Sequence, residues 1–393
     1  MTTDQRPPLV DVRVVSIEHA VAAPLCSRHL ADLGADVIKV EHPEGGDFAR
    51  SYDAAVLGQS AYFVWANRNK RSVALDLKSE AGRTTLGRLL DTADVLLHNL
   101  SPGAMDRLGL DPQTVRHRWP RLVNCSISGY GTTGPDKDRK ALDLLIQGES
   151  GLLSVTGTPA EPCKVGISVA DMCAAMYALS GILAALRARE RTDLGDYIDI
   201  SMLESMVDWM GAPLYLQMYR NSAPARNGAR HNMIAPYGPY VTGDGAVVNI
   251  AVQTREQWES LCRVVLERPE LTTDERFRAN DRRVAHREQL DLILEEVFAG
   301  HTGPSALELL GQADIPCGAV RTLEDVVDHV QLAARDRWTT VSTPNGPVRA
   351  LESPFNLRGV PRGGGRVPGL GQDTASILAE LDPDGGHDVA AST

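Results

Sequence analysis

The segment "VRVVSIEHAVAAPLCSRHLADLGADVIKVE", residues 12–41, decides the fold class. It opens with a short apolar run, Val12–Ile17, passes through the helical pattern of residues 24–34, and closes with a second apolar run, Asp36–Glu41. Short apolar runs bounded by turn residues are typical of buried strands, and strand–helix–strand is the repeating unit of a parallel sheet. The segment therefore predicts an α/β fold.

The same alternation continues through the first half of the chain. Further strands are predicted at residues 72–77, 94–99 and 122–128, with helices at 80–93 and 104–109. Such a series indicates a Rossmann-like domain with a mostly parallel sheet. Ligands of these sheets bind beyond the carboxyl ends of the strands. The loops expected there are "EHPEGGD" (41–47), "DLKSE" (76–80), "HNLSPG" (98–103) and "SGYGTTGP" (128–135).

The pattern changes near Gly211, which suggests a boundary after a first domain of residues 1–215. Residues 221–239 are rich in Gly, Pro and Asn and indicate a linker or functional loop. A hairpin over 240–252 and helices at 256–266, 287–298 and 305–311 follow. We expect residues 225–325 to form a smaller α+β domain.

The composition sets limits on function. The 393 residues are 43% apolar and 23% charged, as in a globular protein of two domains, and the net charge of -11 disfavours nucleic-acid binding. Six cysteines without a C-x-x-C pair suggest reduced thiols. No unbroken apolar stretch approaches a membrane span, and the first residues lack the features of a secretory signal. The cytoplasm is the expected location.

Most catalytic motifs are missing from the sequence. "GYGTTG" (129–134) matches the glycine pattern of dinucleotide folds, but Pro135 and a polar run follow it where a helix should open. There is no phosphate-binding G-x-x-x-x-G-K-[ST] loop, no H-E-x-x-H metal motif and no G-x-S-x-G elbow. These absences argue against an NAD enzyme, an NTPase, a metalloenzyme and a serine hydrolase.

Asp171 stands directly before the apolar run Met172–Leu186, which reads as a buried helix. With Ser168 it fits the S-x-x-[DE] capping box, so a role in starting the helix is one interpretation. Capping is compatible with chemistry, because the helix dipole favours an ionised carboxylate in the first turn. An ionised, partly desolvated carboxylate beside an activated acyl group is a credible nucleophile.

Six stretches together resemble one family. They are "LADLGADVIKVEHPEGGD" (30–47), "NRNKRSVALDLKSEAGR" (67–83), "ADVLLHNLSPGAMDRLGL" (93–110), "PRLVNCSISGYGTTGP" (120–135), "KVGISVADMCAAMYALSGILAALRARERTDLGDYIDISMLE" (164–204) and "IAPYGPY" (234–240). Their order and spacing resemble the family III CoA-transferases, which include formyl-CoA transferase, carnitine CoA-transferase and 2-methylacyl-CoA racemases. The resemblance implies a large domain to which residues 335–393 return, and an obligate homodimer of two interlocked rings.

The resemblance also implies an acyl-CoA:carboxylate CoA-transferase with Asp171 as the covalent nucleophile. Coenzyme A and acyl-CoA are then substrates, an organic acid is the other reactant, and neither a resident cofactor nor a metal is needed. The CoA-binding positions carried over are Val21, Ala22, His42, Leu75, Asp76, Leu77, Lys78, Asn99, Leu100, Ser101, Arg107, Lys140 and Ala141. Lys78, Arg107 and Lys140 are candidates for phosphate contacts.

The resemblance also bears on the substrate pocket and on the type of reaction. The resemblance places His19, Arg230, His231 and Tyr237 as candidates for a substrate pocket. The racemases carry a histidine just before "DLL", where this chain has Leu142, so the proton relay that racemization requires is incomplete. The alternatives are a racemase of the same fold and a CoA- or NAD-binding protein of other function.

Overall fold

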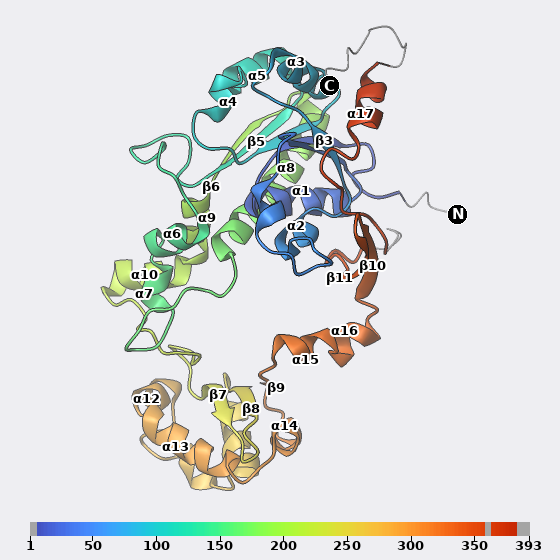
Figure 1. Ribbon diagram of the computed structural model, residues 1–393. Coiled ribbons are helices and arrows are strands. Elements are labelled where there is room, and N and C mark those ends of the chain that lie inside the picture. Colours follow the sequence, from blue (N-terminus) through green and yellow to red (C-terminus); the bar gives the residue numbers. More distant parts are fainter. Residues whose placement is uncertain (1–5, 358–362, 383–393) are drawn as a thin grey trace. The chain divides into compact units, whose positions relative to one another are not determined.

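The computed structural model describes residues 6–357 and 363–382, and it divides the chain into two compact units (Figure 1). The first unit comprises residues 1–151, 165–211 and 332–393, and the second comprises 152–164 and 212–331. Residues 152–164, which lie inside the first predicted domain, thus group with the middle of the chain. Of the predicted domain segments, residues 1–5, 358–362 and 383–393 lie outside the described residues.

A six-stranded sheet forms the centre of the first unit, and all its neighbouring strands are parallel. The α/β prediction is therefore confirmed. The strands are β1 (Arg13–Ile17), β2 (Asp36–Glu41), β3 (Lys70–Ala74), β4 (Val95–His98), β5 (Val123–Ser128) and β6 (Tyr197–Ser201), in the order β3-β2-β1-β4-β5-β6. The chain reverses its direction of winding between β1 and β4, and such a switch point is the usual ligand crevice of an open α/β sheet.

Helices cover both faces of this sheet. On one face α3 (Glu80–Leu90), α4 (Ala104–Arg107), α5 (Pro112–Arg118) and α17 (Thr374–Leu381) contribute to one apolar cluster with β1 to β4. On the other face α1 (Ala22–Asp32) packs against α8 (Val169–Thr192) (Figure 1). The remaining elements of this unit are η1 (Phe48–Ser51), α2 (Ala61–Ala66), α6 (Asp143–Glu149), α9 (Met202–Trp209), β10 (Trp338–Thr343) and β11 (Gly346–Leu351).

One predicted strand is misplaced. The sequence predicts a third strand at residues 72–77, whereas β3 spans Lys70–Ala74 and pairs with β2 from Val37 onward. The reason is electrostatic: Lys70 is fully buried in the strand because its ammonium group lies 2.7 Å from the Glu18 carboxylate. A hydrophobicity pattern does not identify a strand that starts with a paired charge.

α8 is longer than the predicted run 172–186 and is apolar enough, by length and composition, to cross a membrane. Its most apolar 18-residue window has a mean hydropathy of 1.7, and 44% of that window is buried. This is weak evidence, because the core helix of a soluble protein meets the same criteria. Within the first unit α8 packs against α1, α6, α9, β5 and β6.

The second unit has its own core around the antiparallel sheet β7 (Tyr237–Val241), β8 (Val247–Ala251) and β9 (Cys317–Ala319). The predicted hairpin is confirmed, and it turns at Gly245 with a φ of 83°. The helical elements assigned to this unit are α7 (Leu152–Val155), α11 (Arg255–Ser260), η2 (Leu261–Val265), η3 (Pro269–Thr272), α12 (Asn280–Ala285), α13 (Arg287–Phe298), α14 (Gly303–Gln312) and α15 (Leu323–Val327). α10 (Gly211–Arg220) and α16 (Val330–Ala334) cross two of the four points at which the chain passes from one unit to the other.

The last described segment of the chain pairs with the edge of the six-stranded sheet. The Ser72 main-chain N–H donates to the Asp373 carboxylate at 2.9 Å, and the Asp373 N–H donates to the Ser72 carbonyl at 2.9 Å. Gly371 donates to the Ser72 hydroxyl at 2.9 Å. Residues 371–373 thus satisfy main-chain groups of β3 that would otherwise form an open sheet edge.

The Asp373 contact should make a measurable contribution to stability. We expect Asp373→Ala to lower the free energy of unfolding of the first unit by about 1–3 kcal/mol, because the buried Ser72 N–H loses its acceptor. Denaturant unfolding followed by circular dichroism measures the change. Asp373→Asn keeps an amide oxygen at this position and should cost less than Asp373→Ala, whereas equal losses would show that the N–H acceptor is unimportant.

Candidate active site

Asp171 lies in the first turn of α8 and is partly buried. The predicted capping box is wrong: in the described structure the Ser168 side chain caps no N–H of this helix. Instead the Asp143 carboxylate, at the start of α6, accepts the Ala170 N–H at 2.8 Å. A carboxylate from a distant part of the sequence thus takes the place of a local N-cap side chain.

Asp143 is held in place on both carboxylate oxygens. Its second oxygen accepts the side-chain amide of Gln147 at 2.7 Å, and the Gln147 carbonyl oxygen accepts the Val165 N–H at 2.9 Å. The segment entering α8 is therefore tied to α6 at two points, which fixes the position of Asp171 relative to Asp143.

The protonation of Asp171 differs from the expectation. Burial, and secondly the negative charge of Asp143, raise the pKa of Asp171 to about 7. The expectation that the helix start keeps this carboxylate ionised is therefore wrong, because desolvation and a like charge outweigh the favourable helix dipole. A carboxylate that titrates near neutrality is typical of functional sites and uncommon for a surface helix cap.

The loops that follow the strands gather at the carboxyl edge of the sheet, as the parallel register requires. The Asn99 side chain, after β4, accepts the His19 N–H and donates to the His19 carbonyl, both at 2.9 Å. The Nε2 atom of His42 lies 3.9 Å from the Oδ1 atom of Asp76, so the loops after β2 and β3 lie close together at this point. Gly129 approaches Ala141 so closely that an added Cβ would lie 2.1 Å from the alanine Cβ.

The predicted CoA-binding residues differ in how far they are exposed to solvent. Val21, Ala22 and Leu75 are buried. Val21 directly precedes α1 and has no polar side chain with which to cap it. Four of the others are partly buried: Leu77, Asn99, Leu100 and Ala141. The remaining six have exposed side chains: His42, Asp76, Lys78, Ser101, Arg107 and Lys140.

Three aromatic side chains, Phe48, Tyr52 and Tyr62, escaped the sequence analysis and form a series of rings with the predicted His19. His19 stacks on Phe48 with 5.3 Å between ring centroids, Phe48 lies 5.7 Å from Tyr52, and Tyr52 lies 5.6 Å from Tyr62. Burial, then the charges of Asp47 and Asp171, raise the pKa of Tyr52, so its phenol lies within electrostatic reach of Asp171. Phe48 lies in η1, Tyr52 follows it and Tyr62 lies at the start of α2, and no periodic sequence pattern singles out these three rings.

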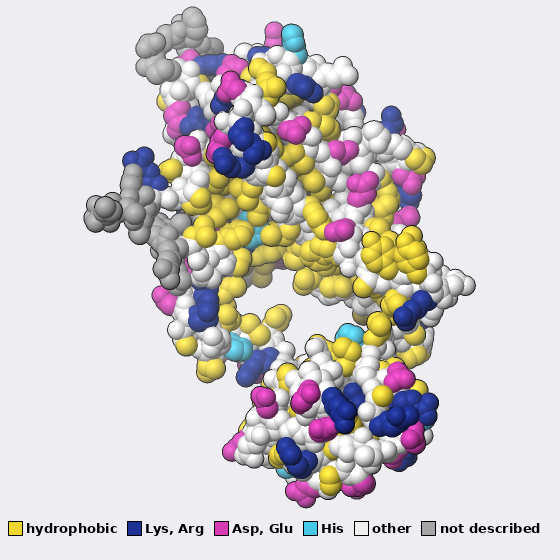
Figure 2. All heavy atoms as spheres, turned by 180° about the vertical axis from the view of Figure 1, so that it is seen from behind, with side chains coloured by type: hydrophobic (Ala, Val, Ile, Leu, Met, Phe, Trp, Pro, Cys, Tyr) yellow, Lys and Arg dark blue, Asp and Glu magenta, His cyan; other side chains and the backbone are white. Residues whose placement is uncertain are grey.

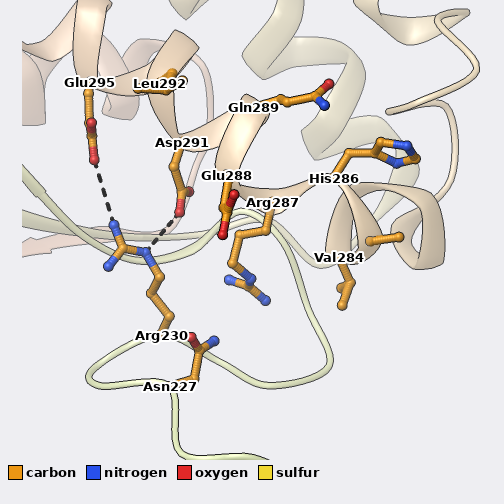
Figure 3. Close-up of a pocket in the computed structure, with 11 residues that line it drawn as sticks. Asn227, Arg230, Val284, His286, Arg287, Glu288, Gln289, Asp291, Leu292 and Glu295 are labelled. Carbon is orange, nitrogen blue, oxygen red and sulfur yellow. Dashed lines mark hydrogen bonds and ion pairs between the residues drawn. The ribbon is translucent and has the colours of Figure 1, made fainter. Parts of the chain in front are cut away.

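The other predicted pocket residues belong to the second unit. Arg230 lies on the rim of a hollow of about 780 Å³, and its guanidinium points to two carboxylates of α13, with Nε 2.9 Å from Asp291 and Nη2 3.7 Å from Glu295 (Figure 3). Its charge is thus already paired within this unit. His231 stacks on Tyr237 with 5.0 Å between ring centroids.

Two motif interpretations can be compared with the structure. Between Ser128 and Asp143, all within the described residues, the chain forms no helix, so "GYGTTG" is a loop as predicted. Among residues 6–357 and 363–382, no three or more His, Cys, Asp or Glu side chains are grouped to hold a metal ion.

The first unit is thus an α/β protein with a partly buried carboxylate at the start of α8, and comparisons with known proteins show its family. The family model of CoA-transferase family III matches residues 9–374, and the chain belongs to this family. It is 34% identical to succinate–glutarate CoA-transferase of Agrobacterium fabrum, across 96% of this chain and 97% of the relative. It is 35% identical to acetyl-CoA:oxalate CoA-transferase of Acetobacter aceti, across 92% and 95% of the two chains.

Solved structures show the same relationship. A CaiB/BaiF family protein from Brucella suis superimposes with a TM-score of 0.84 at 35% identity, covering 95% of this chain and 99% of the other. A Mycobacterium tuberculosis protein gives 0.83 at 29% identity, covering 95% and 99%. The protein is therefore a family III CoA-transferase, as the sequence resemblance indicated.

The raised pKa of Asp171 predicts a pH dependence. The Asp171 side chain is mainly protonated below its pKa and gains its charge as the pH rises. With Asp171 as the expected nucleophile, kcat/KM should therefore increase between about pH 6 and 8. Asp143→Asn removes the negative neighbour and lowers the pKa of Asp171. The rising limb of the plot of kcat/KM against pH should therefore move to lower pH. Because burial is the larger cause, the limb should stay above the usual range of an aspartate.

A matched variant separates this effect from general changes in charge. Glu149→Gln removes an exposed carboxylate at the other end of α6 and should leave the limb in place. An unshifted limb in Asp143→Asn, measured on folded protein, would contradict coupling between the two aspartates.

Proposed function

We propose that this enzyme moves CoA between an acyl-CoA thioester and a free organic acid, with Asp171 as the covalent nucleophile. The observation that carries the proposal is the partly buried carboxylate at the start of α8, whose pKa is raised to about 7. An environment that disfavours charge on Asp171 favours its neutral acylated forms. The two intermediates proposed below are both neutral at this side chain.

The proposed reaction proceeds by double displacement. The Asp171 carboxylate attacks the thioester carbonyl, the C–S bond breaks, and CoA leaves as a thiolate beside an aspartyl–acyl anhydride. The thiolate attacks the aspartyl carbonyl of the anhydride, which releases the donor acid as a carboxylate and leaves an aspartyl-CoA thioester. The acceptor carboxylate then repeats both steps in reverse, so Asp171 is regenerated.

The loops at the carboxyl edge of the sheet support a CoA site there. The uncapped start of α1 at Val21 and Ala22 offers main-chain N–H groups and a positive dipole end, both suited to a pyrophosphate. Lys78 and Lys140 are exposed on the loops after β3 and β5, Arg107 is exposed at the end of α4, and all three are candidates for contacts with the phosphates. We propose the thirteen predicted CoA-binding residues as the ligand site on this basis.

The substrates are proposed by analogy with the relatives. Those relatives are named for succinate, glutarate, oxalate and mesaconate, so succinyl-CoA or acetyl-CoA with a dicarboxylic acid are the first pairs to assay. We propose His19 for the acyl end of the site and retain Arg230, His231 and Tyr237 as candidates for the acceptor. For Arg230 this role requires release from Asp291. The proposed location is the cytoplasm.

Leu142 supports transfer over racemization. It is 70% exposed, stands directly before Asp143 at the start of α6, and carries no group able to move a proton. A racemase requires two proton-transfer groups on opposite faces of the substrate carbon. The proposed reaction requires none, because a carboxylate attacks without a partner base.

Replacement of Asp171 tests the proposal. We expect Asp171→Ala to lower acyl exchange by more than about 10³-fold, because no covalent intermediate forms. Incubation of the unmodified enzyme with its donor and hydroxylamine should place a hydroxamate on Asp171, detected by peptide mass spectrometry. Asp193→Asn, at the other end of the same helix, should keep both the activity and the label. Undiminished exchange in folded Asp171→Ala would end the proposal.

We also propose that the chain forms an interlocked homodimer. Within the first unit Leu142, Leu144 and Leu145 are exposed around the start of α6, as are Trp209 and, on α8, Met176 and Leu183. In the second unit Tyr215, Met218 and Tyr219 are exposed on α10. Figure 2 shows hydrophobic side chains gathered over a broad area of one face. Exposed apolar area of this kind marks an interface.

The dimer has a direct test. Light scattering at micromolar concentration should give twice the chain mass of 42.5 kDa. Arg substitutions of Met176 and Leu183 should shift the mass toward one chain or prevent folding. A stable, active single chain from the unmodified sequence would exclude the dimer.

A further inference from the structure

The turn between β1 and α1, residues 18–21, is held by side chains from two other loops. Asn99 forms two hydrogen bonds with the main chain of His19, at 2.9 Å each. Asp47, in the loop after β2, accepts the Ala20 N–H at 3.1 Å. The turn leads directly into Val21 and Ala22 at the proposed CoA site.

Ala20 needs this support because its backbone is unfavourable. Its φ is 62°, in the left-handed region that glycine enters freely and that a side chain with a Cβ enters at a cost. The residue is not glycine, so the conformation has to be imposed from outside the turn. The Asp47 carboxylate contributes to this, because it accepts the Ala20 N–H in the observed backbone arrangement.

Asp47 is itself rigidly anchored. Its side chain is fully buried, and one oxygen accepts the N–H groups of Ala20 and Ala49, at 3.1 and 2.9 Å. The other oxygen lies 2.8 Å from the Lys39 ammonium. Burial opposes ionisation, but Lys39 and these hydrogen bonds hold the pKa of Asp47 well below its ordinary value. The anchor is thus a permanent negative charge.

The same loop also sets the His19 ring. The ring stacks on Phe48, the residue that follows Asp47, at an interplanar angle of 18°. Its Nδ1 lies 3.8 Å from the Asp47 carboxylate, which is too long for a hydrogen bond. Asp47 and Phe48 therefore determine both the main chain and the ring orientation at the proposed acyl end of the site.

We propose that Asp47 is a positioning residue for CoA transfer, which holds Ala20 in its left-handed conformation and so orients the turn against the thioester. The proposal rests on the proposed placement of CoA at this edge. Asp47 acts through the turn and touches no reacting atom. A displacement of about 1 Å at a reacting centre can lower a rate by about 10²-fold.

The test is a rescue experiment. In the full-length enzyme Asp47→Ala should lower kcat by about 10- to 100-fold, with a smaller change in KM for the acyl-CoA. Ala20→Gly in that background should recover a large part of the loss, because glycine adopts the left-handed conformation without the anchor. Ala20→Gly alone should stay within about twofold of the unmodified enzyme, because Asp47 and Asn99 still hold the turn.

Asp32 provides the matched control. Its carboxylate is almost as buried, with 3% of the side chain exposed, and it pairs with Arg28, Arg68 and Asn69 away from the turn. Asp32→Ala should destabilise the protein while kcat of the folded enzyme is retained. If Asp47→Ala fails to fold, the pair Lys39→Met/Asp47→Ala also removes the buried ammonium, which would otherwise keep only its 3.3 Å contacts with Glu18, and the rescue is tested there.

Several outcomes would overturn the proposal. They are a kcat loss in Asp32→Ala equal to that in Asp47→Ala, a rescue that does not occur in folded protein, and inactivity of Ala20→Gly alone. None of them affects the proposed function, which stands or falls with Asp171→Ala.

Discussion

Two buried carboxylates and two buried ammonium groups, from Glu18, Asp47, Lys39 and Lys70, form the interaction on which the active edge of the sheet depends. Burial would raise the pKa of Glu18, yet Lys70 and Lys39 lower it to about 2. Such groups are tolerable inside a protein only when their charges balance and their hydrogen bonds are complete. Because each group comes from a different strand or loop, the balance exists only when β1, β2, β3 and their loops have assembled correctly.

The pKa of the Asp171 carboxylate is shifted in the opposite direction. Asp171 has no counter-ion among its principal electrostatic neighbours; the largest influences on its pKa are burial and the charge of Asp143. In the first unit, neighbouring lysines therefore lower the pKa of Glu18 and Asp47, whereas burial raises the pKa of Asp171. The former suit a scaffold, and the latter suits a group that becomes acylated and is then restored.

Much of this architecture follows from the sequence, and the remainder has identifiable causes. The alternation of apolar runs predicted five of the six parallel strands, because buried strands of an α/β sheet need a continuous apolar surface. The start of β3 was missed because Lys70 is buried through a partner 52 residues away. At the site, the position of Asp171 before an apolar helix singled it out, and the family resemblance implied its role as nucleophile. Asp143, which accepts the Ala170 N–H, and the ring of Tyr52 were missed because only the tertiary fold brings them near α8.

The pairing of Ser72 with Asp373 has a consequence for how the protein is made. The ribosome releases the six strands of the parallel sheet within the first 201 residues, then residues 212–331 of the second unit, and only near the end the residues that satisfy the edge of β3. During most of synthesis the nascent sheet therefore has an unprotected edge, which is the kind of surface that recruits other strands. Its completion is a late event in translation, and an incomplete chain that ends before Asp373 would carry a lasting site for aggregation or chaperone recognition.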